Sequence, residues 1–154
     1  KSGSVVNVIS EKAVLQGTVR SFSSEVRELL HRRINEVAGG ICQAFGATHE
    51  FSVPGGCPAV VNSPAGAALM QSVAEAVVGP EQVAQIAPMM VGEDMSEFLN
   101  RAPGCFVLVG AASPETGPFS PHHSPTFDFD ERKLSTGVAL MANTAFAWLD
   151  EQAG

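Results

Sequence analysis

The spacing of apolar residues changes period twice before residue 54, and this pattern constrains the fold more than any other feature of the sequence. Apolar and polar residues alternate over residues 13–21 and again over residues 47–53, which is typical of half-buried strands. Between them, from Val26 to Phe45, apolar residues recur at steps of three and four, which predicts a helix that follows Ser23 as its N-cap. A β-branched run over residues 5–9 adds a first strand, so the predicted order is strand, strand, helix, strand.

A Pro- and Gly-rich break from Pro54 to Pro58 follows this first part. We expect a boundary there, with one domain over residues 1–55 and a second over residues 56–154. The second part predicts a helix started by Asn62 or Ser63 with Pro64 and ended at Gly79, a strand near residues 83–87, a helix over residues 95–101, a buried strand over residues 106–109, a loop over residues 111–125 and a last helix capped by Asp130. Strands and helices alternate, so the predicted fold class is α/β, with helices covering a layered sheet.

Charge and composition exclude several classes of protein. The 16 Asp and Glu residues outnumber the 9 Lys and Arg residues, and a net charge of −7 argues against nucleic acid as a partner, because non-specific binding to it needs a positive surface. No apolar run approaches the roughly 20 residues of a membrane helix, so we expect no membrane partner. The 3 cysteines show no C-x-x-C spacing, and their odd number favours reduced thiols in the cytoplasm over a disulfide framework. Because the chain opens at Lys1 and reaches strand-like residues at once, we expect it to be a piece of a longer protein.

Two adjacent histidines, His122 and His123, stand in the predicted loop just before an acidic segment over residues 127–130. A neutral imidazole is the commonest metal ligand in proteins, and a nearby carboxylate can fix its tautomer. A pair of ordinary surface histidines is the commoner case, however, because no second pair of ligands stands out in the sequence. His31 and His49, on a predicted helix and strand, fit surface or packing roles.

Two further pairs of polar residues could take part in chemistry. Glu93 and Asp94 precede the short helix predicted at residue 95, where they could support a metal or act as acid and base, although simple capping by Asp94 explains them equally well. Asn7 and Arg20 are expected on two adjacent strands. The planar guanidinium of an arginine suits a substrate carboxylate, and an exposed strand arginine is the alternative.

Six short segments, in order along nearly the whole chain, resemble motifs of the co-catalytic metallo-amidohydrolases of peptidase family M20, which include hippurate hydrolase, aminoacylase and the auxin–amino acid conjugate hydrolases. They are Asn7-Val8-Ile9-Ser10, Gly17-Thr18-Val19-Arg20, Pro58-Ala59-Val60-Val61-Asn62, Gly92-Glu93-Asp94-Met95-Ser96-Glu97-Phe98, Pro103-Gly104-Cys105-Phe106 and His123-Ser124-Pro125-Thr126-Phe127-Asp128-Phe129-Asp130-Glu131. Ser10 stands where the family usually has proline, and Met95 where it has phenylalanine.

The resemblance implies a fold and a set of roles. Residues 1–55 would be part of a β-α-β lid, or dimerisation, domain, and residues 56–154 the C-terminal part of the catalytic domain. His123 matches the last metal ligand of the family, whereas His122 matches none. Asn7 and Arg20 match lid residues that reach the active site of a neighbouring subunit and hold the substrate carboxylate. Glu93 and Asp94 would give near-site support only.

The implied reaction is hydrolysis of the amide bond of an N-acyl amino acid by an enzyme with two divalent metals, zinc or manganese, per site. The family's general base and most of its metal ligands have no match here, so we expect no catalytic residue in this chain, no activity from the chain alone, and a homodimer. The alternative is a non-catalytic dimerisation or binding module derived from the same family. A third reading, a generic α/β binding protein, would require all six matches to be accidental.

Overall fold

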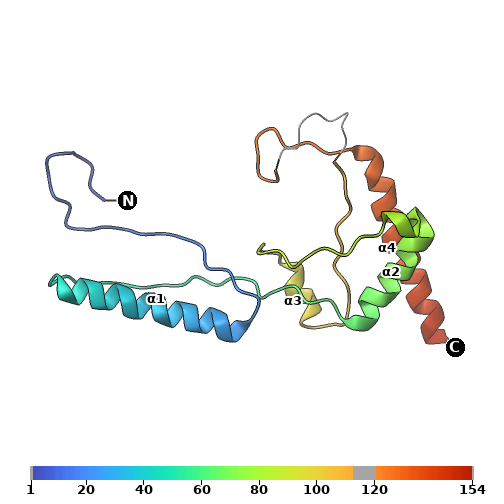
Figure 1. Cartoon of the computed structure of the whole chain (residues 1–154), viewed down its shortest axis with the longest axis horizontal. Coiled ribbons are helices and arrows are strands. Elements are labelled where there is room, and N and C mark those ends of the chain that lie inside the picture. Colours follow the sequence, from blue (N-terminus) through green and yellow to red (C-terminus); the bar gives the residue numbers. More distant parts are fainter. Residues whose placement is uncertain (1, 113–120, 154) are drawn as a thin grey trace. The chain divides into compact units, whose positions relative to one another are not determined.

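A computed structural model describes residues 2–112 and 121–153, and it shows helices joined by long stretches of extended chain (Figure 1). In chain order the elements are α1 (Ser24–Ala44), α2 (Pro64–Val78), the 3-10 turn η1 (Pro80–Gln82), α3 (Met95–Leu99), the 3-10 turn η3 (Glu131–Lys133) and α4 (Leu134–Ala153). The chain divides into two compact units. The first unit contains Lys1–Ala59 and Met90–Gly92, and the second contains Val60–Met89 and Glu93–Gly154.

The predicted N-caps Ser23, Ser63 and Asp130 and the end of α2 at Gly79 are confirmed, because these signals are local. The helix expected over residues 95–101 is shorter and ends at Leu99. Ser23 and Ser63 are the N-caps of α1 and α2, and each hydroxyl accepts a hydrogen bond from the backbone N–H three residues further on, at 3.2 and 3.1 Å. Gly46 and Gly79 follow the two helices with φ of +67° and +90°, a conformation that glycine adopts without strain. Asp130 caps η3, which leads directly into α4.

The predicted strands do not form in the described part of the chain. They were expected over residues 5–9, 13–21, 47–53, 83–87 and 106–109, and these segments are extended chain or turns instead. Among residues 2–112 and 121–153, strand-like pairing is limited to one isolated antiparallel bridge between Ser2 and Ala13. Alternating apolar and polar side chains make a segment suitable for a sheet. Its backbone forms a strand only when a neighbouring segment donates and accepts the hydrogen bonds between strands. The α/β class is therefore not confirmed.

In the first unit, the extended segment that follows α1 runs back alongside the helix (Figure 1). His49 holds the two together, since its Nε2 lies 2.9 Å from Oδ1 of Asn35. The helix comes close to this ring at Gly39, where a Cβ would lie only 2.8 Å from Cε1 of His49. Elsewhere the apolar side of α1 is only partly covered, and Ile41, near its C-terminal end, keeps 57% of its surface exposed.

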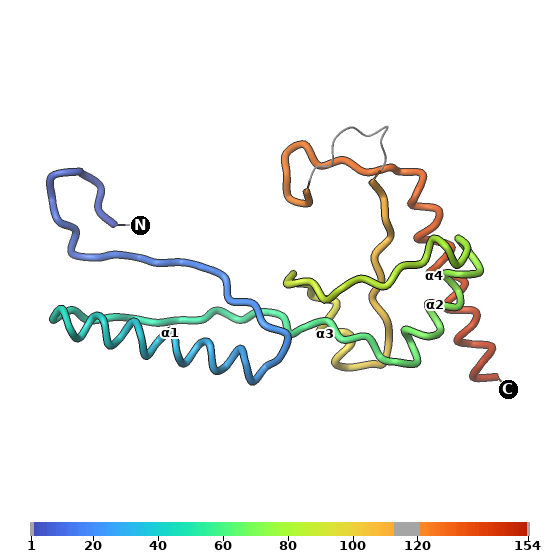
Figure 2. Tube along the Cα trace, in the orientation of Figure 1, coloured from blue at the N-terminus to red at the C-terminus, as the bar shows by residue number. Residues whose placement is uncertain are grey.

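In the second unit, α2 packs against α4 (Figure 2), and the small core lies between them. Met70 and Val73 of α2 meet Leu140 of α4, and the hydroxyl of Thr144 lies 3.6 Å from the sulfur of Met70. Several large apolar residues of α4 stay outside this contact. They are Leu134, Val138, Met141, Phe146, Trp148 and Leu149, all more than half exposed.

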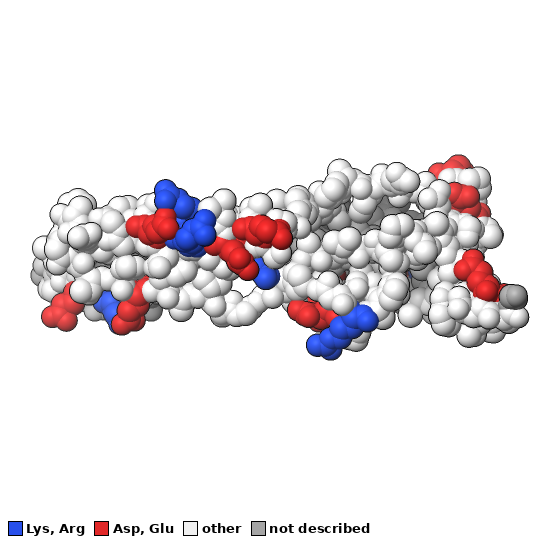
Figure 3. Space-filling view, turned by 90° about the horizontal axis from the view of Figure 1, so that it is seen from below, with Lys and Arg blue, Asp and Glu red and all other residues white. Residues whose placement is uncertain are grey.

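On the face drawn in Figure 3, some acidic side chains lie beside basic ones and others stand without a basic neighbour, with wide uncharged areas between them. On α1 such neighbours form ion pairs, because Glu36 contacts both Arg32 and Arg33. None of the described helices is both long and apolar enough to cross a membrane. The three cysteines, Cys42, Cys57 and Cys105, are free thiols.

Candidate functional site

A β-turn presents the two histidines that the sequence singled out. The backbone N–H of Ser124 donates to the carbonyl oxygen of Pro121 at 3.2 Å, so His122 and His123 occupy the two central positions of the turn. His123 has a φ of +65° and, among the described residues, is the only one other than glycine with a positive φ. Histidine enters this left-handed region more readily than most residues, but at a cost on the order of 1 kcal/mol.

A second turn follows at once and stiffens the loop. The N–H of Phe127 donates to the carbonyl oxygen of Ser124 at 3.0 Å. The Ser124 hydroxyl also accepts from the N–H of Thr126 at 3.2 Å and lies 2.9 Å from the Thr126 hydroxyl. Residues 121–127 therefore form two linked turns that are closed by their own hydrogen bonds.

An aromatic contact joins the first turn to the second. The ring of His122 meets the ring of Phe127 edge-on, with centroids 4.9 Å apart and planes at 75°, and Phe127 in turn lies 6.0 Å from Phe129. Edge-to-face aromatic pairs contribute about 0.5–1.5 kcal/mol. This is comparable to the cost of the left-handed conformation at His123, so the contact is strong enough to help maintain it.

The far end of the loop is fixed by Asp130. Its backbone N–H donates to the carbonyl oxygen of Ala111 at 2.8 Å, and its carboxylate accepts two hydrogen bonds from the guanidinium of Arg132, each at 2.8 Å. These hydrogen bonds from Arg132 hold the pKa of the nearly buried Asp130 carboxyl below its usual value. The loop thus ends at a charged anchor where α4 begins.

Of the two acidic residues before α3, Glu93 and not Asp94 binds the start of the helix. Capping by Asp94 is wrong, because its side chain is exposed and makes no capping hydrogen bond. Instead, Oε1 of the half-buried Glu93 accepts from the N–H of Met95 at 3.2 Å, and the Glu93 carbonyl accepts from the hydroxyl of the buried Ser96 at 2.8 Å. Glu93 therefore organises the start of α3, and no hydrogen bond or ion pair joins it to His123 within the described residues.

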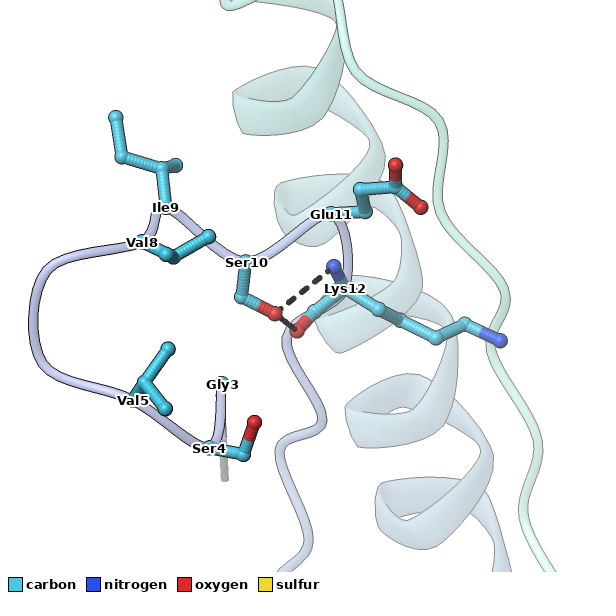
Figure 4. A pocket seen from close by; sticks show the side chains of 8 residues that line it. All are labelled: Gly3, Ser4, Val5, Val8, Ile9, Ser10, Glu11 and Lys12. Carbon is cyan, nitrogen blue, oxygen red and sulfur yellow. Dashed lines mark hydrogen bonds between the residues drawn. The ribbon is translucent and has the colours of Figure 1, made fainter.

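The expected substrate residues, Asn7 and Arg20, both lie in the first unit and are exposed. Their expected placement on paired strands is wrong, because Asn7 lies in a turn and Arg20 in unpaired extended chain. A shallow pocket is lined by residues 3–5 and 8–12, and Ser10 donates a hydrogen bond of 2.7 Å to the Lys12 carbonyl at its side (Figure 4); Asn7 is not one of the lining residues. Arg20 lies beside Gly92, where a Cβ would be 3.3 Å from its Nη1.

The sequence alone did not predict a polar cluster in the second unit, in which Asn62 and Ser63 bind the backbone of Gly104 and Phe106. The Asn62 side chain bonds both backbone groups of Phe106, and Ser63 bonds the Gly104 carbonyl through its N–H and its hydroxyl, at 2.9 and 3.2 Å. Gly66 lies against the same carbonyl. The signal was an Asn-Ser pair before a proline, which predicted only a helix cap; nothing local pointed to a partner 44 residues away.

Whether these residues could hold a metal ion depends on which of their nitrogen, oxygen and sulfur atoms are available as ligands. His123 is exposed, and no hydrogen bond to its ring occurs within the described residues, so its nitrogens suit a metal ligand. The residues that the structure describes contain no group of three or more His, Cys, Asp or Glu placed to hold an ion. These residues therefore offer a ligand rather than a complete metal site.

Comparison with known proteins finds similar hydrolases. The family model for peptidase family M20/M25/M40 matches residues 3–147. YhaA of Bacillus subtilis (strain 168), which is named as an amidohydrolase, is 39% identical over 142 residues, covering 92% of this chain and 36% of that protein. Thermostable carboxypeptidase 1 of Saccharolobus solfataricus is 31% identical over 142 residues, covering 92% and 35%.

N-acetyldiaminopimelate deacetylase of Lactococcus lactis subsp. cremoris is 33% identical over 139 residues, covering 90% of this chain and 35% of the deacetylase. The chain therefore spans little more than a third of the length of these curated relatives. No solved structure matches it at a significant level.

Proposed function

Because the chain belongs to peptidase family M20/M25/M40, we propose that it is part of a metal-dependent hydrolase that cleaves the amide bond of N-acyl amino acids. This proposal is supported by the names of the relatives, which are an amidohydrolase, a carboxypeptidase and a deacetylase. The motifs at Asn7, Arg20 and His123 favour a substrate that carries both an acyl amide and a free carboxylate. The odd number of cysteines, which are free thiols in the structure, supports a cytoplasmic location.

His123 carries this proposal. It is an exposed imidazole at the centre of a closed turn, in the segment that resembles the ligand motif of the family. We assign it one metal-ligand position, to be completed by ligands outside the described residues. A bound pair of zinc or manganese ions would polarise the amide carbonyl and lower the pKa of a bound water. What this chain contributes is the placement of one nitrogen donor.

Arg20 and Asn7 are assigned to the substrate. A guanidinium donates two parallel hydrogen bonds to a carboxylate, which fixes the orientation of the amino acid portion. Asn7 would add a neutral donor beside it. We propose that both act at the active site of a neighbouring subunit in a homodimer, and that Glu93 and Asp94 only support the site from nearby.

The proposal is tested by measuring the Zn²⁺ affinity of the full-length protein and of its variants. His123→Ala should weaken Zn²⁺ binding by more than about 10-fold, since even the loss of an outer partner of a ligand costs 10–100-fold. His31→Ala, on α1, is the matched control and should bind Zn²⁺ normally. Unchanged Zn²⁺ affinity in His123→Ala would remove the ligand assignment and the function built on it.

A second candidate, a non-catalytic dimerisation or binding module, is favoured by the only partly covered apolar side of α1. An assay for hydrolysis of N-acyl amino acids distinguishes the two candidate functions. We expect the 154-residue chain alone to leave hippurate and N-acetyl amino acids uncleaved with Zn²⁺ or Mn²⁺ present, and the full-length protein to hydrolyse them. A full-length protein that associates but hydrolyses neither would favour the module.

A further inference from the structure

His122 differs from His123 in what its ring touches. The His122 ring rests edge-on against Phe127, whereas the exposed His123 ring makes no aromatic contact, hydrogen bond or ion pair within the described residues. Both belong to the turn closed by the hydrogen bond from Ser124 to Pro121. One histidine is therefore held by the protein, and its neighbour is left available.

We propose that His122 is a positioning residue for His123. Its ring, packed on Phe127, ties the first turn to the second and so keeps His123 in the left-handed conformation that presents its imidazole. This inference rests on the proposed role of His123 as a metal ligand.

The geometry accounts for a histidine, rather than glycine, at the left-handed position. Glycine would adopt a φ of +65° freely but has no donor atom. A histidine supplies the donor and needs an external constraint to stay in that conformation. The hydrogen bonds of Ser124 with Thr126 and Phe127 fix one side of the turn, and the ring of His122 fixes the other.

Because a ligand that is already oriented loses less freedom on binding, removing the constraint should reduce metal affinity without removing a donor. His122→Ala and Phe127→Leu each delete one side of the ring contact. We expect each to raise the Zn²⁺ dissociation constant about 10-fold, the lower end of the range for groups that orient a ligand. His122→Phe keeps an aromatic ring of suitable size and cannot bind metal.

The experiment measures Zn²⁺ affinity by competition with a chelator in the full-length protein, with His31→Ala as control. In the same variants without metal, NMR couplings and Cα shifts of residue 123 report whether its φ stays positive. We expect His122→Ala to shift residue 123 out of the left-handed region and to weaken Zn²⁺ binding, and His122→Phe to restore both.

Two results would overturn the inference. If His122→Phe binds Zn²⁺ as weakly as His122→Ala, His122 is itself a ligand. If His122→Ala keeps both the conformation of residue 123 and the affinity, the ring contact positions nothing. The NMR measurement needs no metal, so it decides the role of His122 in the turn even if His123→Ala shows that His123 is not a ligand.

Discussion

The side-chain amide of Asn62 and the backbone of Phe106 form two hydrogen bonds in opposite directions. Nδ2 of Asn62 donates to the Phe106 carbonyl at 2.9 Å, and the Phe106 N–H donates to Oδ1 at 2.8 Å. This is the donor and acceptor pattern that a neighbouring strand would offer to one residue. A single side chain thus satisfies the backbone of Phe106, whose segment has a strand-like sequence but, in the part of the chain that the structure describes, no strand beside it.

Replacing Asn62 should destabilise the second unit. In Asn62→Ala the half-buried N–H and C=O of Phe106 both lose their partner, and each such loss costs about 1–3 kcal/mol. We expect a lower urea midpoint with an unchanged slope. Asn100→Ala, at an exposed helix end, should change the midpoint little, and equal effects of the two substitutions would contradict the importance of this pairing.

Two glycines in helices of the second unit should respond oppositely to alanine. A Cβ on Gly66 would lie 2.9 Å from both the carbonyl carbon and the oxygen of Gly104, which are backbone atoms, whereas a Cβ on Gly137 would meet nothing within 4 Å. Overpacking costs about 1–3 kcal/mol, and a free helical Gly→Ala gains about 0.5–1 kcal/mol. Thermal unfolding should show a lower Tm for Gly66→Ala and a higher Tm for Gly137→Ala.

Acid should weaken the end of the histidine loop through Asp130. Its pKa is lowered in the folded chain by hydrogen bonds from Arg132, so the stabilisation is complete above the ordinary Asp pKa of about 3.9 and is lost as pH falls through the folded value. The Tm of the unmodified protein should therefore fall more steeply below about pH 4 than that of Asp130→Asn. Asp150→Asn should retain the steep fall; if it does not, Asp130 is not the group responsible.

Under the proposed function, Arg20 should matter for substrate binding in the longer protein to which this chain would belong. Losing a charged hydrogen-bond partner costs about 2–5 kcal/mol in buried interfaces, so Arg20→Ala should lower kcat/KM on N-acyl amino acids accordingly. Arg20→Lys keeps the charge but lacks the planar fork, and we expect it to recover little. Amides without the free carboxylate should be cleaved equally by all three forms. An unchanged kcat/KM in Arg20→Ala would remove Arg20 from the site.

The chain should associate with itself at micromolar concentration. The apolar residues of α1 are only partly covered, with Ile41 57% exposed, and within the described residues the extended segments form no strand ladder, so an edge of this chain can pair with another copy. Sedimentation equilibrium should show dimers or larger species, and Ile41→Lys should shift the equilibrium towards monomer. A monomer over the whole concentration range would show that this surface does not recruit a second copy.

The helices predicted from the sequence are present, whereas the predicted strands do not form in the described part of the chain, and one physical reason explains both outcomes. Ser23, Ser63 and Asp130 cap helices through atoms within three residues, so the information lies in the segment itself. A strand needs a partner that the segment does not specify. Residues 106–109 read as a buried strand, yet what holds Phe106 is Asn62, 44 positions away.

For the candidate site, the sequence likewise predicted the local feature, which is the histidine loop, and did not predict its conformation. The loop and its histidines stand out in the sequence, but the left-handed conformation of His123 and the ring contact of His122 depend on Phe127 and Ser124 together. Capping of α3 by Asp94 was one of the two alternatives that the sequence left open, because Asp94 immediately precedes the helix, whereas the longer side chain of Glu93 reaches the N–H of Met95. A choice between adjacent acidic residues depends on backbone geometry that composition does not reveal.

The contact between Gly39 and His49 sets a rule for how this protein can change over generations. A larger residue at 39 would press on the imidazole at 2.8 Å, so such a change becomes tolerable only after position 49 has become small or has moved. Gly40, one position along the same helix, faces open space and carries no such dependence. Among descendants of this sequence, positions 39 and 49 should vary together, while position 40 should drift towards alanine independently.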